Sequence, residues 1–414
     1  IGVPIAYSIG LSAMLTLLVH IDFIPAVTTL SQQMATALDS FALLAIPFFI
    51  LAGQLMNRGG IAVRLIDFAK VLVGRLPGGL AFVNIMANML FGAISGSAAA
   101  SASAIGGFMH QRMVKEGYDR SFSAAVNVTS ATTGLLIPPS NILIVYSLAS
   151  GGVSIAALFI AGYVPGILMG LAIMGVAAAF AYRKNYPVGE RVAIGKGLIK
   201  FLDALPSLFL LVIVIGGIIA GIFTATEASA VAVLYTLILA FIYRELRWRD
   251  LPGILIRTVG TTSIVLLLVG TSMALSWVMS FENIPQNVSE GLLSVSENPI
   301  IILLLINMIL LVVGIFMDMT PAVLIFTPIF LPVVTSQLGI DPIHFGIIMI
   351  MNLTVGLCTP PVGSLLFIGC SVADVRIGDI IKPLLRIFVA MILVLMLVTF
   401  LPSLSLWLPG IFGY

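Results

Sequence analysis

Apolar segments follow one another along nearly the whole chain, and only short polar stretches separate them. A run of roughly 20 apolar residues can cross a bilayer as an α-helix. We therefore expect spanning helices at 2–19, 41–57, 154–182, 203–222, 226–243, 259–280 and 377–402. Two longer spans, 120–150 and 343–372, carry a break, and residues 60–75 predict a basic amphipathic helix that lies along the membrane surface.

Two further apolar segments, 77–118 and 299–340, each predict two helices with a turn between them. Lysine and arginine flank both ends of the first segment, whereas only carboxylates flank both ends of the second. Because the two ends of each segment share one type of flank, each segment must enter and leave the membrane on the same side. We predict two re-entrant hairpins whose tips lie near the midplane of the membrane.

The 19 Lys and Arg residues are grouped, and none occurs between Thr258 and Val375. The groups lie at 58–75, 112–120, 183–200, 244–257 and 376–386. The positive-inside rule places such groups in the cytoplasm. With this assignment every predicted span connects a basic cytoplasmic loop to an outer loop without Lys or Arg. The N-terminus is then inside and the C-terminus outside.

Composition narrows the class of protein further. Of the 414 residues, 60% are hydrophobic and 9% are charged, and the mean hydropathy is +1.20. Soluble domains carry about 25% charged residues, so we expect an all-α polytopic membrane protein in contact with the lipid bilayer and with no nucleic-acid partner. Cys358 and Cys370 are interpreted as packing residues. The chain begins within an apolar run, and we expect a few residues before Ile1.

The stretches GLLIPPSN (134–141) and GLCTPPVG (356–363) interrupt the two longer spans. Adjacent prolines remove backbone donors and clash with the preceding turn, so the first helix is expected to stop at about Ile137. Non-helical backbone at membrane depth is tolerated only where protein buries it or where it lines a cavity. A single Pro-Pro pair could be a structural kink, but two matched breaks predict a binding site.

The chain contains an internal repeat with an offset of 222 residues. At this offset special residues align in pairs, namely Pro77 with Pro299, Gly92 with Gly314, GYD at 117–119 with GID at 339–341, Thr132 with Thr354, Gly134 with Gly356, and both Pro-Pro pairs. The flanking charges indicate that the two copies enter the membrane from opposite sides. An inverted-topology repeat of this kind is typical of secondary transporters.

Both predicted hairpin tips are polar: SGSAAASAS runs from Ser95 to Ser103, and MDMTPA runs from Met317 to Ala322. Small residues let helices pack closely and serine hydroxyls offer oxygens, so the first tip is either a tight helix contact or part of a site. Asp318 is expected near the midplane, where an ionisable side chain indicates a functional site. Its alternative role is to cap the helix that follows.

No Lys or Arg lies near either tip or either break in the sequence. The charge of an organic anion bound there must be balanced by helix N-termini and by co-bound cations, which predicts sodium coupling. Proton coupling is less favoured because Asp318 has no histidine near it in sequence. His110 and His344 are expected near the hairpin bases, in solvated positions.

Four stretches resemble the large membrane subunit (M subunit) of tripartite ATP-independent periplasmic (TRAP) transporters, namely GAISGSAAASASAIGGFM, GYDRSFSAAVNVTSATTGLLIPPS, GIFTATEASAVAV and GLCTPPVG. The resemblance covers nearly the whole chain and implies an elevator-type fold, with a scaffold and a mobile transport domain, in the bacterial inner membrane. It implies two partners, a small four-helix membrane subunit (Q subunit) and a periplasmic substrate-binding protein (P subunit). It also implies sodium-driven import of an organic acid such as a C4-dicarboxylate or sialic acid.

Carried over by position, the resemblance implies two sodium sites and one substrate site, and no organic cofactor. The first sodium site would involve Ser95, Ser97, Ser103, Gly134, Pro138 and Ser140. The second would involve Asp318, Thr320, Gly356 and Thr359. Substrate would lie near Ser97, Ser101, Asn141 and Thr320. Val362-Gly363 replaces Ser140-Asn141 in the second repeat, so ligands there could come from the backbone alone.

The resemblance and the charge pattern together divide the chain into two parts. The predicted scaffold comprises residues 1–76, 183–257 with a connecting arm, and 258–298 with the arm of the second repeat. The predicted transport domain comprises 77–182 and 299–402. Trp248 is expected to anchor the scaffold at the membrane interface.

Other classes of membrane protein fit the sequence less well. An ion channel needs rings of like residues and a continuous water path. An intramembrane enzyme needs a second catalytic group beside Asp318, and a purely structural partner has no need of broken repeats. Among transporters, the alternative is a stand-alone sodium/carboxylate carrier of the same superfamily, and co-purification of a small helical subunit would distinguish the two.

Overall fold

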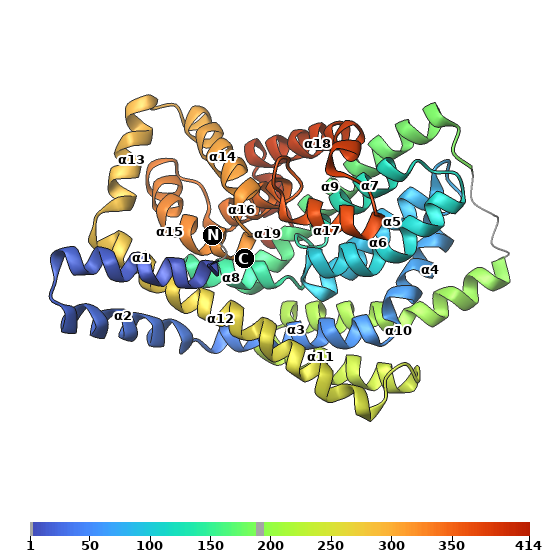
Figure 1. Cartoon of the computed structure of the whole chain (residues 1–414), viewed down its shortest axis with the longest axis horizontal. Helices are drawn as coiled ribbons and strands as arrows, with labels where there is room; N and C mark the ends of the chain where they lie inside the picture. The colour runs from blue at the N-terminus through green and yellow to red at the C-terminus, as the bar shows by residue number, and fades with distance from the viewer. Residues whose placement is uncertain (1–2, 188–193) are drawn as a thin grey trace.

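The computed structural model describes residues 3–187 and 194–414, and the regular structure in these ranges is entirely helical (Figure 1). Eight of the described helices are long and apolar enough to cross a membrane, which confirms a polytopic α-helical protein. Residues 188–193 of the predicted connecting arm, and the first residue of the predicted span 2–19, lie outside the described residues.

Two series of five helices carry the internal repeat. The first series is α5 Gly79–Ser95, α6 Ala98–Lys115, α7 Arg120–Thr133, α8 Asn141–Ala149 and α9 Ile155–Lys184. The second is α14 Pro299–Phe316, α15 Met319–Pro332 with a π-helical end at Val333–Gln337, α16 Pro342–Gly356, α17 Ser364–Ala373 and α18 Ile377–Phe400. In each series a two-helix hairpin precedes a broken helix and then a long span, so the predicted hairpins, breaks and repeat are confirmed.

Matching caps begin the two broken helices. The Asp119 carboxylate accepts hydrogen bonds from the backbone N–H groups of Ser121 and Phe122 at the start of α7. At the start of α16, Asp341 accepts in the same way from the N–H groups of the second and third following residues. A carboxylate at this position satisfies helix donors that have no intrahelical partner. The two repeats therefore begin their broken helices with the same kind of N-cap.

The remaining helices surround these two series. They are α1 Ile5–His20, α2 Phe23–Leu38, a 3₁₀ turn Phe41–Leu44, α3 Ala45–Arg58, α4 Ile61–Val73, α10 Ile194–Ile219, α11 Ala225–Ile242, a 3₁₀ turn Trp248–Asp250, α12 Leu251–Phe281, α13 Ile284–Val295 and α19 Ser403–Ile411. Helix α11 packs along α3, while α1 and α2 pack along α12. In Figure 1, α1, α2, α3, α10, α11 and α12 form the lower layer, whereas α13 stands at the upper left and α19 lies near the centre.

Helix α2 was not predicted, because residues 20–40 were interpreted as a connection outside the membrane. Polar residues such as Thr28, Ser31 and Gln32 make this stretch too hydrophilic for the span criterion. In the structure, α2 returns beside α1 and contacts α12, and it leads through the 3₁₀ turn into α3 (Figure 1). The predicted span 41–57 is confirmed as a segment long and apolar enough to cross a membrane, over Phe41–Arg58, and α2 precedes it.

The first broken helix ends earlier than predicted. Helix α7 stops at Thr133, and residues up to Ser140 form turns and bends, whereas the two prolines alone predicted a stop at about Ile137. All residues from Gly134 to Ser140 are buried. The break is therefore enclosed by protein, as non-helical backbone at membrane depth requires.

The two histidines near the hairpin bases are buried, which corrects the expectation that they are solvated. His110 is 6% exposed and its Nδ1 lies 3.1 Å from Ser123 Oγ. His344 is 2% exposed and its Nδ1 lies 2.5 Å from Ser405 Oγ. Each imidazole fills a packed position and has a hydroxyl partner, and the sequence could not show this because Ser405 lies on the C-terminal helix α19.

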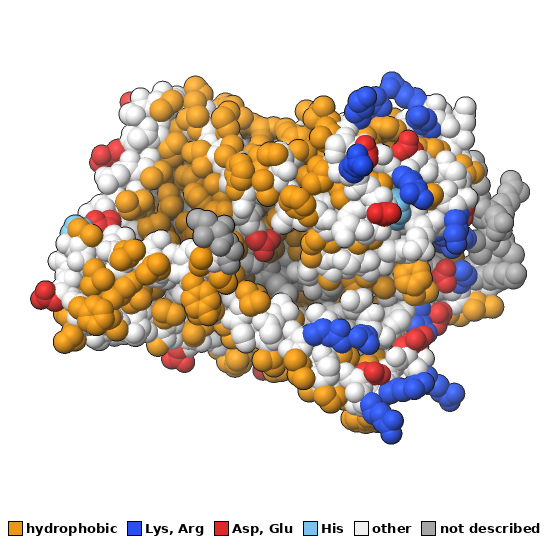
Figure 2. Space-filling view, viewed as in Figure 1, with side chains coloured by type: hydrophobic (Ala, Val, Ile, Leu, Met, Phe, Trp, Pro, Cys, Tyr) orange, Lys and Arg blue, Asp and Glu red, His pale blue; other side chains and the backbone are white. Residues whose placement is uncertain are grey.

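Basic side chains gather at one end of the molecule. Figure 2 shows Lys and Arg only over the right part of the face in view, whereas Asp and Glu occur at both ends. At the opposite end, a contact between His20 Nε2 and a carboxylate oxygen of Glu282, at 3.1 Å, joins α1 to the end of α12. The uneven distribution of Lys and Arg along the sequence therefore corresponds to an uneven distribution between the two ends of the folded molecule.

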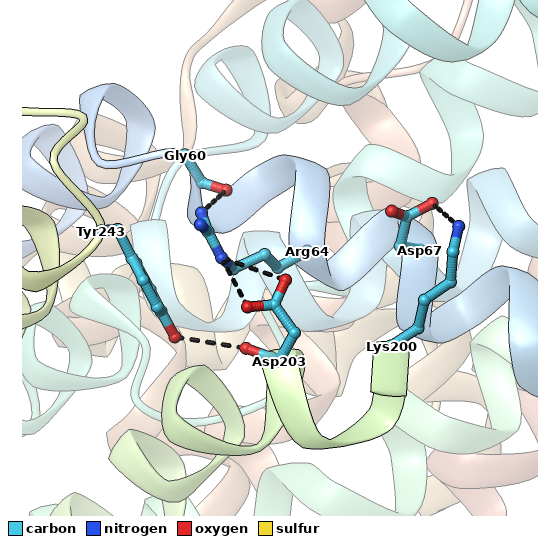
Figure 3. A network of polar contacts seen from close by, with 6 residues as sticks. All are labelled: Gly60, Arg64, Asp67, Lys200, Asp203 and Tyr243. Atoms are coloured by element: carbon cyan, nitrogen blue, oxygen red, sulfur yellow. Dashed lines mark hydrogen bonds and ion pairs between the residues drawn. The ribbon is translucent and has the colours of Figure 1, made fainter. Parts of the chain in front are cut away.

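A polar network ties α4 to α10 and to the end of α11 at the basic end (Figure 3). Arg64 pairs with Asp203 at 3.4 Å, and its guanidinium carbon lies 3.6 Å from the centre of the Tyr243 ring. The Tyr243 hydroxyl in turn donates to the Asp203 carbonyl at 3.2 Å. One turn away, Lys200 and Asp67 form a second ion pair at 2.8 Å. These contacts attach the amphipathic helix α4 to its neighbours in the lower layer.

Candidate functional site

Both hairpin tips and both helix breaks line one cavity of about 340 Å³. The first tip contributes Ser95, Gly96 and Ser97, and the second contributes Asp318 to Thr320. The remaining lining residues are Ala98, Ala99, Ala100, Leu135, Asn141, Ile142, Val145, Leu357, Ser364, Leu365 and Ile368 around the tips and breaks, Ile46, Ile50, Gly53, Gln54 and Asn57 on α3, and Thr261 and Val265 on α12. The inverted repeats thus converge on a single site, formed where four interruptions of helix meet.

Four helix N-termini face this cavity. The first residues of α6, α8, α15 and α17 are all among its lining residues. A helix N-terminus carries partial positive charge and backbone N–H groups without intrahelical partners. Several such ends around one cavity favour a bound anion.

Asp318 is the only charged side chain that lines the cavity among the described residues. It occupies the N-cap position of α15 with extended backbone angles, but its side chain accepts no capping hydrogen bond. The side chain thus makes none of the cap bonds that Asp119 and Asp341 make at the starts of α7 and α16. Its carboxylate is exposed toward the cavity and is available to a cation.

The first tip is held by its own serines. Ser97 caps α6, with its hydroxyl accepting from the N–H of Ala100 at 3.2 Å, and the hydroxyl of Ser95 lies 3.5 Å from the carbonyl oxygen of Ser97. Gly96 has a φ of +61°, and a Cβ there would lie 2.7 Å from Asn141 Nδ2. A side chain at this position would therefore strain the backbone and displace Asn141.

Asn141 begins α8 directly opposite this tip. Its side-chain oxygen is buried and has no hydrogen-bond partner among the described residues. Buried polar atoms are normally paired, so an unpaired one beside a cavity indicates a missing partner such as a ligand or water. Asn141 and Thr320, both predicted as substrate contacts, do line the cavity.

Ser101 and Ser103, by contrast, do not line the cavity. The Ser101 hydroxyl is fully buried and donates to Asn88 Oδ1 at 2.7 Å. Asn88 also donates to Asn127 and Ser130 of α7, so Ser101 belongs to a network that fixes hairpin and broken helix together. Ser103 lies on the exposed face of α6.

The other predicted site residues are not among the residues that line the cavity. Gly134 and Gly356 pack against the first helix of each hairpin: a Cβ on Gly134 would lie 2.4 Å from Gly92 Cα, and one on Gly356 would lie 2.6 Å from Gly314 Cα. Pro138 is buried within the first break, which Ser140 closes by donating to the carbonyl of Leu135 at 2.5 Å. Thr359 donates to the carbonyl of Val355 at 2.8 Å.

Four polar lining residues were not predicted from the sequence. Gln54 and Asn57 lie three positions apart on α3, Thr261 lies on α12, and Ser364 begins α17. Two amides one turn apart within an apolar span were the available signal for α3, because polar side chains in spans normally face protein or a cavity. These residues bring α3 and α12 into the site beside the two repeats.

A sequence model of the family described as "Tripartite ATP-independent periplasmic transporter, DctM component" matches residues 1–404 of the chain. Over 413 residues the chain is 58% identical to the protein YgiK of Salmonella typhimurium, covering 100% of this chain and 95% of that protein. It is 41% identical to the C4-dicarboxylate TRAP transporter large permease protein DctM of Pseudomonas aeruginosa, covering 98% of this chain and 94% of the relative. It is 38% identical to the sialic acid TRAP transporter large permease protein SiaM of Vibrio cholerae, covering 100% and 96%.

The fold is also found in a solved structure of low sequence similarity. The crystal structure of the YdaH transporter of Alcanivorax borkumensis superposes with a TM-score of 0.69 at 12% identity, covering 94% of this chain and 90% of the other. This likeness concerns the fold alone. The family match and the two TRAP relatives concern the sequence, and they agree with the convergent repeats described above. The chain is a large permease subunit rather than an enzyme, and it belongs to the DctM component family of tripartite ATP-independent periplasmic transporters.

Proposed function

We propose that this chain imports an organic acid anion together with sodium ions, by an elevator motion, after a periplasmic substrate-binding protein delivers the substrate. The observation that carries the proposal is the composition of the cavity. Four helix N-termini and several hydroxyl and amide groups line it, and Asp318 is its only charged lining residue in the described part of the chain. The helix N-termini favour an anion, but the carboxylate of Asp318 repels it, and a co-bound cation would offset that repulsion.

The proposed cation sites lie on either side of the cavity. The first lies between Ser95, Ser97 and the loop 134–140, and the second lies between Asp318, Thr320 and the loop 356–359. Hydroxyl, carbonyl and carboxylate oxygens are the ligands that hard cations prefer. Freed carbonyls at half-helix ends serve the same purpose in other secondary transporters.

The proposed substrate site lies between the tips, at Ser97, Asn141 and Thr320. A volume of about 340 Å³ falls within the range of roughly 300–1,000 Å³ common to small-molecule sites. Relatives named for C4-dicarboxylate and for sialic acid are similarly close to the chain, at 41% and 38% identity. We propose a carboxylate of one of these two kinds as substrate.

The proposed partners are the small four-helix Q subunit and the periplasmic P subunit. We place the chain in the bacterial inner membrane with its basic end in the cytoplasm, its N-terminus cytoplasmic and its C-terminus periplasmic. The gathering of Lys and Arg at one end of the molecule supports this orientation (Figure 2). A stand-alone carrier of the same superfamily would need neither partner.

The elevator proposal rests on two sets of contacts. The buried amide network of Asn88, Asn127 and Ser101 joins the first hairpin to its broken helix, and Asn352 donates to Asn307 Oδ1 at 2.7 Å in the second repeat. These elements would move together as the transport domain. The ion pairs that hold α4 to α10 (Figure 3) support a scaffold made of α1 to α4 and α10 to α13.

The test is uptake into proteoliposomes that contain the chain and its small subunit. Purified binding protein and labelled organic acids are supplied outside, with and without an inward sodium gradient. Uptake that needs both sodium and the binding protein is expected. Uptake without the binding protein would assign the chain to the stand-alone carriers, and uptake without sodium would contradict both cation sites.

A further inference from the structure

A second, mainly apolar groove of about 470 Å³ runs between α9 and α18, away from the transport cavity. Its lining residues follow one stripe on each helix, namely Ala172, Gly175, Val176, Ala179, Phe180 and Arg183 on α9, and Arg386, Ala390, Leu393 and Val394 on α18. Residues three and four positions apart lie on one face of a helix. Each stripe is therefore continuous, and at 1.5 Å per residue the α9 stripe is about 16 Å long.

The groove lies between two helices of the membrane-spanning type. Both helices are long and apolar enough to span a membrane. Small residues on α9 create the hollow, since Gly175 is exposed and a Cβ there would meet nothing within 4 Å. An open apolar trough of this length on a spanning surface fits an acyl chain.

One end of the groove carries unpaired positive charge. Arg183 and Arg386 close that end, and both are exposed. Arg386 lies nine residues inside the apolar helix α18, and its guanidinium carbon is 4.9 Å from the centre of the Phe180 ring. Within the described residues neither arginine forms an ion pair. An arginine at such a position within a span needs an anionic partner or contact with water.

An adjoining hollow adds charges of both signs. Lys184 and Lys382 line it together with Arg386, and the carboxylates of Asp119 and Asp379 face it from the start of α7 and from α18. With Arg183 counted, the charged groups around this end are four cations and two carboxylates. Figure 2 shows Lys and Arg side chains gathered at the upper right, over the ends of α9 and α18. The end of the groove is therefore positive overall.

We propose that this groove binds an anionic phospholipid. Its phosphate would lie between Arg183 and Arg386, and one acyl chain would lie along the stripe from Phe180 to Ala172. Arginine binds phosphate oxygens bidentately, and basic pockets between spanning helices are suited to anionic lipid head groups. A phospholipid offers an anionic head group for the positive end and an acyl chain for the apolar stripe. Free phosphate would occupy the positive end only.

The experiment is native mass spectrometry of the intact transporter in detergent, titrated with phosphatidylglycerol, with phosphatidylcholine of the same chains, or with inorganic phosphate. The site variant is R183Q/R386Q. The matched control R249Q/R257Q removes two exposed arginines from the same basic end but outside the groove. A second variant, Gly175→Phe, fills the trough without changing charge, and Gly260→Phe on α12 is its control because that position is also open.

We expect the wild type to prefer phosphatidylglycerol, and R183Q/R386Q to weaken its binding about 30-fold, since each basic residue near a head group contributes about 1 kcal/mol. Gly175→Phe should also weaken it, while both controls should leave it unchanged. Equal loss in R249Q/R257Q would mean general charge attraction and would overturn the site. Equal binding of phosphatidylcholine, or binding of inorganic phosphate alone, would overturn the lipid assignment. Gly175→Phe keeps the test decisive if the arginine variant fails to fold.

Discussion

Gly134 lies directly against Gly92, so that a Cβ built on Gly134 would be 2.4 Å from the Cα atom of Gly92. The second repeat has the same relationship, with 2.6 Å between a Cβ on Gly356 and the Cα of Gly314. In each repeat the first helix of the hairpin and the broken helix therefore touch through their backbones. Two glycines are needed where two backbones meet, which explains why these four positions align at the repeat offset.

Substitution of Gly134 by alanine should destabilise the protein. The added methyl group has no free space, and overpacking of this kind costs roughly 1–3 kcal/mol. We expect a lower melting temperature of the purified protein and, at temperatures where it stays folded, reduced uptake because the break is displaced. The control is Gly216→Ala on α10, where a Cβ meets nothing within 4 Å. An unchanged melting temperature for Gly134→Ala would contradict the close backbone contact.

Asp318→Asn should abolish sodium-driven uptake and leave assembly intact. The change keeps the shape of the side chain but removes the only charge that lines the cavity among the described residues. Because asparagine keeps a side-chain oxygen at the N-cap position, the start of α15 should persist. Uptake against sodium concentration is the measurement, with size-exclusion chromatography as the check on folding.

The matched control for Asp318→Asn is Glu290→Gln, an equivalent loss of negative charge on the exposed surface of α13. It should transport as the wild type does. Asp318→Ala should behave like Asp318→Asn, since the proposed role is electrostatic. Normal sodium-dependent uptake by either Asp318 variant would remove the second cation site as proposed.

Much of this fold could be predicted because the repeat is visible in local sequence features that do not depend on tertiary packing. Pro-Pro pairs stop helices by local chemistry, and flanking charges report the side from which each hairpin enters. These signals located both hairpins and both breaks. Asp318 was singled out by its expected depth, whereas Ser97, Asn141 and Thr320 were named through the family resemblance, and all four line one cavity.

What the sequence missed depends on contacts between distant segments. Helix α2 is too polar to be recognised as a span and is held by packing on α1 and α12. Ser101 has the residue type of a ligand, but its partner Asn88 lies thirteen residues away on the other helix of the hairpin. The contribution of Gln54 to the cavity depends on how α3 packs against the tips. None of these relationships follows from local spacing.

Asn141 should contribute to substrate affinity through its amide. Asn141→Ala removes the side chain whose oxygen lacks a partner, and the loss of one hydrogen bond of about 1 kcal/mol would raise the KM several-fold. Asn141→Asp has the same shape but places a negative charge beside an anion, so its effect should be larger. The measurement is the KM for the labelled acid at saturating sodium.

The control for Asn141 is Ser101→Ala, at another of the four predicted substrate contacts. Ser101 donates to a buried amide rather than facing the cavity. Its loss should lower the melting temperature and leave the KM unchanged. If Ser101→Ala raised the KM while Asn141→Asp did not, the substrate site would have to be moved along α6.

The elevator proposal requires that the first hairpin tip move past α3. Gly53 of α3 lies against this tip, with 3.1 Å between a Cβ at that position and Ser95 Cα. Cysteines introduced at these two positions would be neighbours across this contact, and a disulfide between them should block uptake until it is reduced. The Ser95→Cys single variant provides the reference rate, because Ser95 is also a proposed sodium ligand.

A second cross-link distinguishes motion from general damage. Asp67 and Lys200 join α4 to α10, both within the proposed scaffold, and their ion pair is more than a third exposed on each side. Surface pairs contribute little to stability, so cysteines at both positions should be tolerated. Joining them with a bifunctional maleimide should leave uptake near the wild-type rate, since these helices do not move relative to each other. If the 53–95 disulfide left uptake unaffected, the first hairpin tip would not slide past α3. If both cross-links blocked uptake equally, α4 would belong to the moving transport domain.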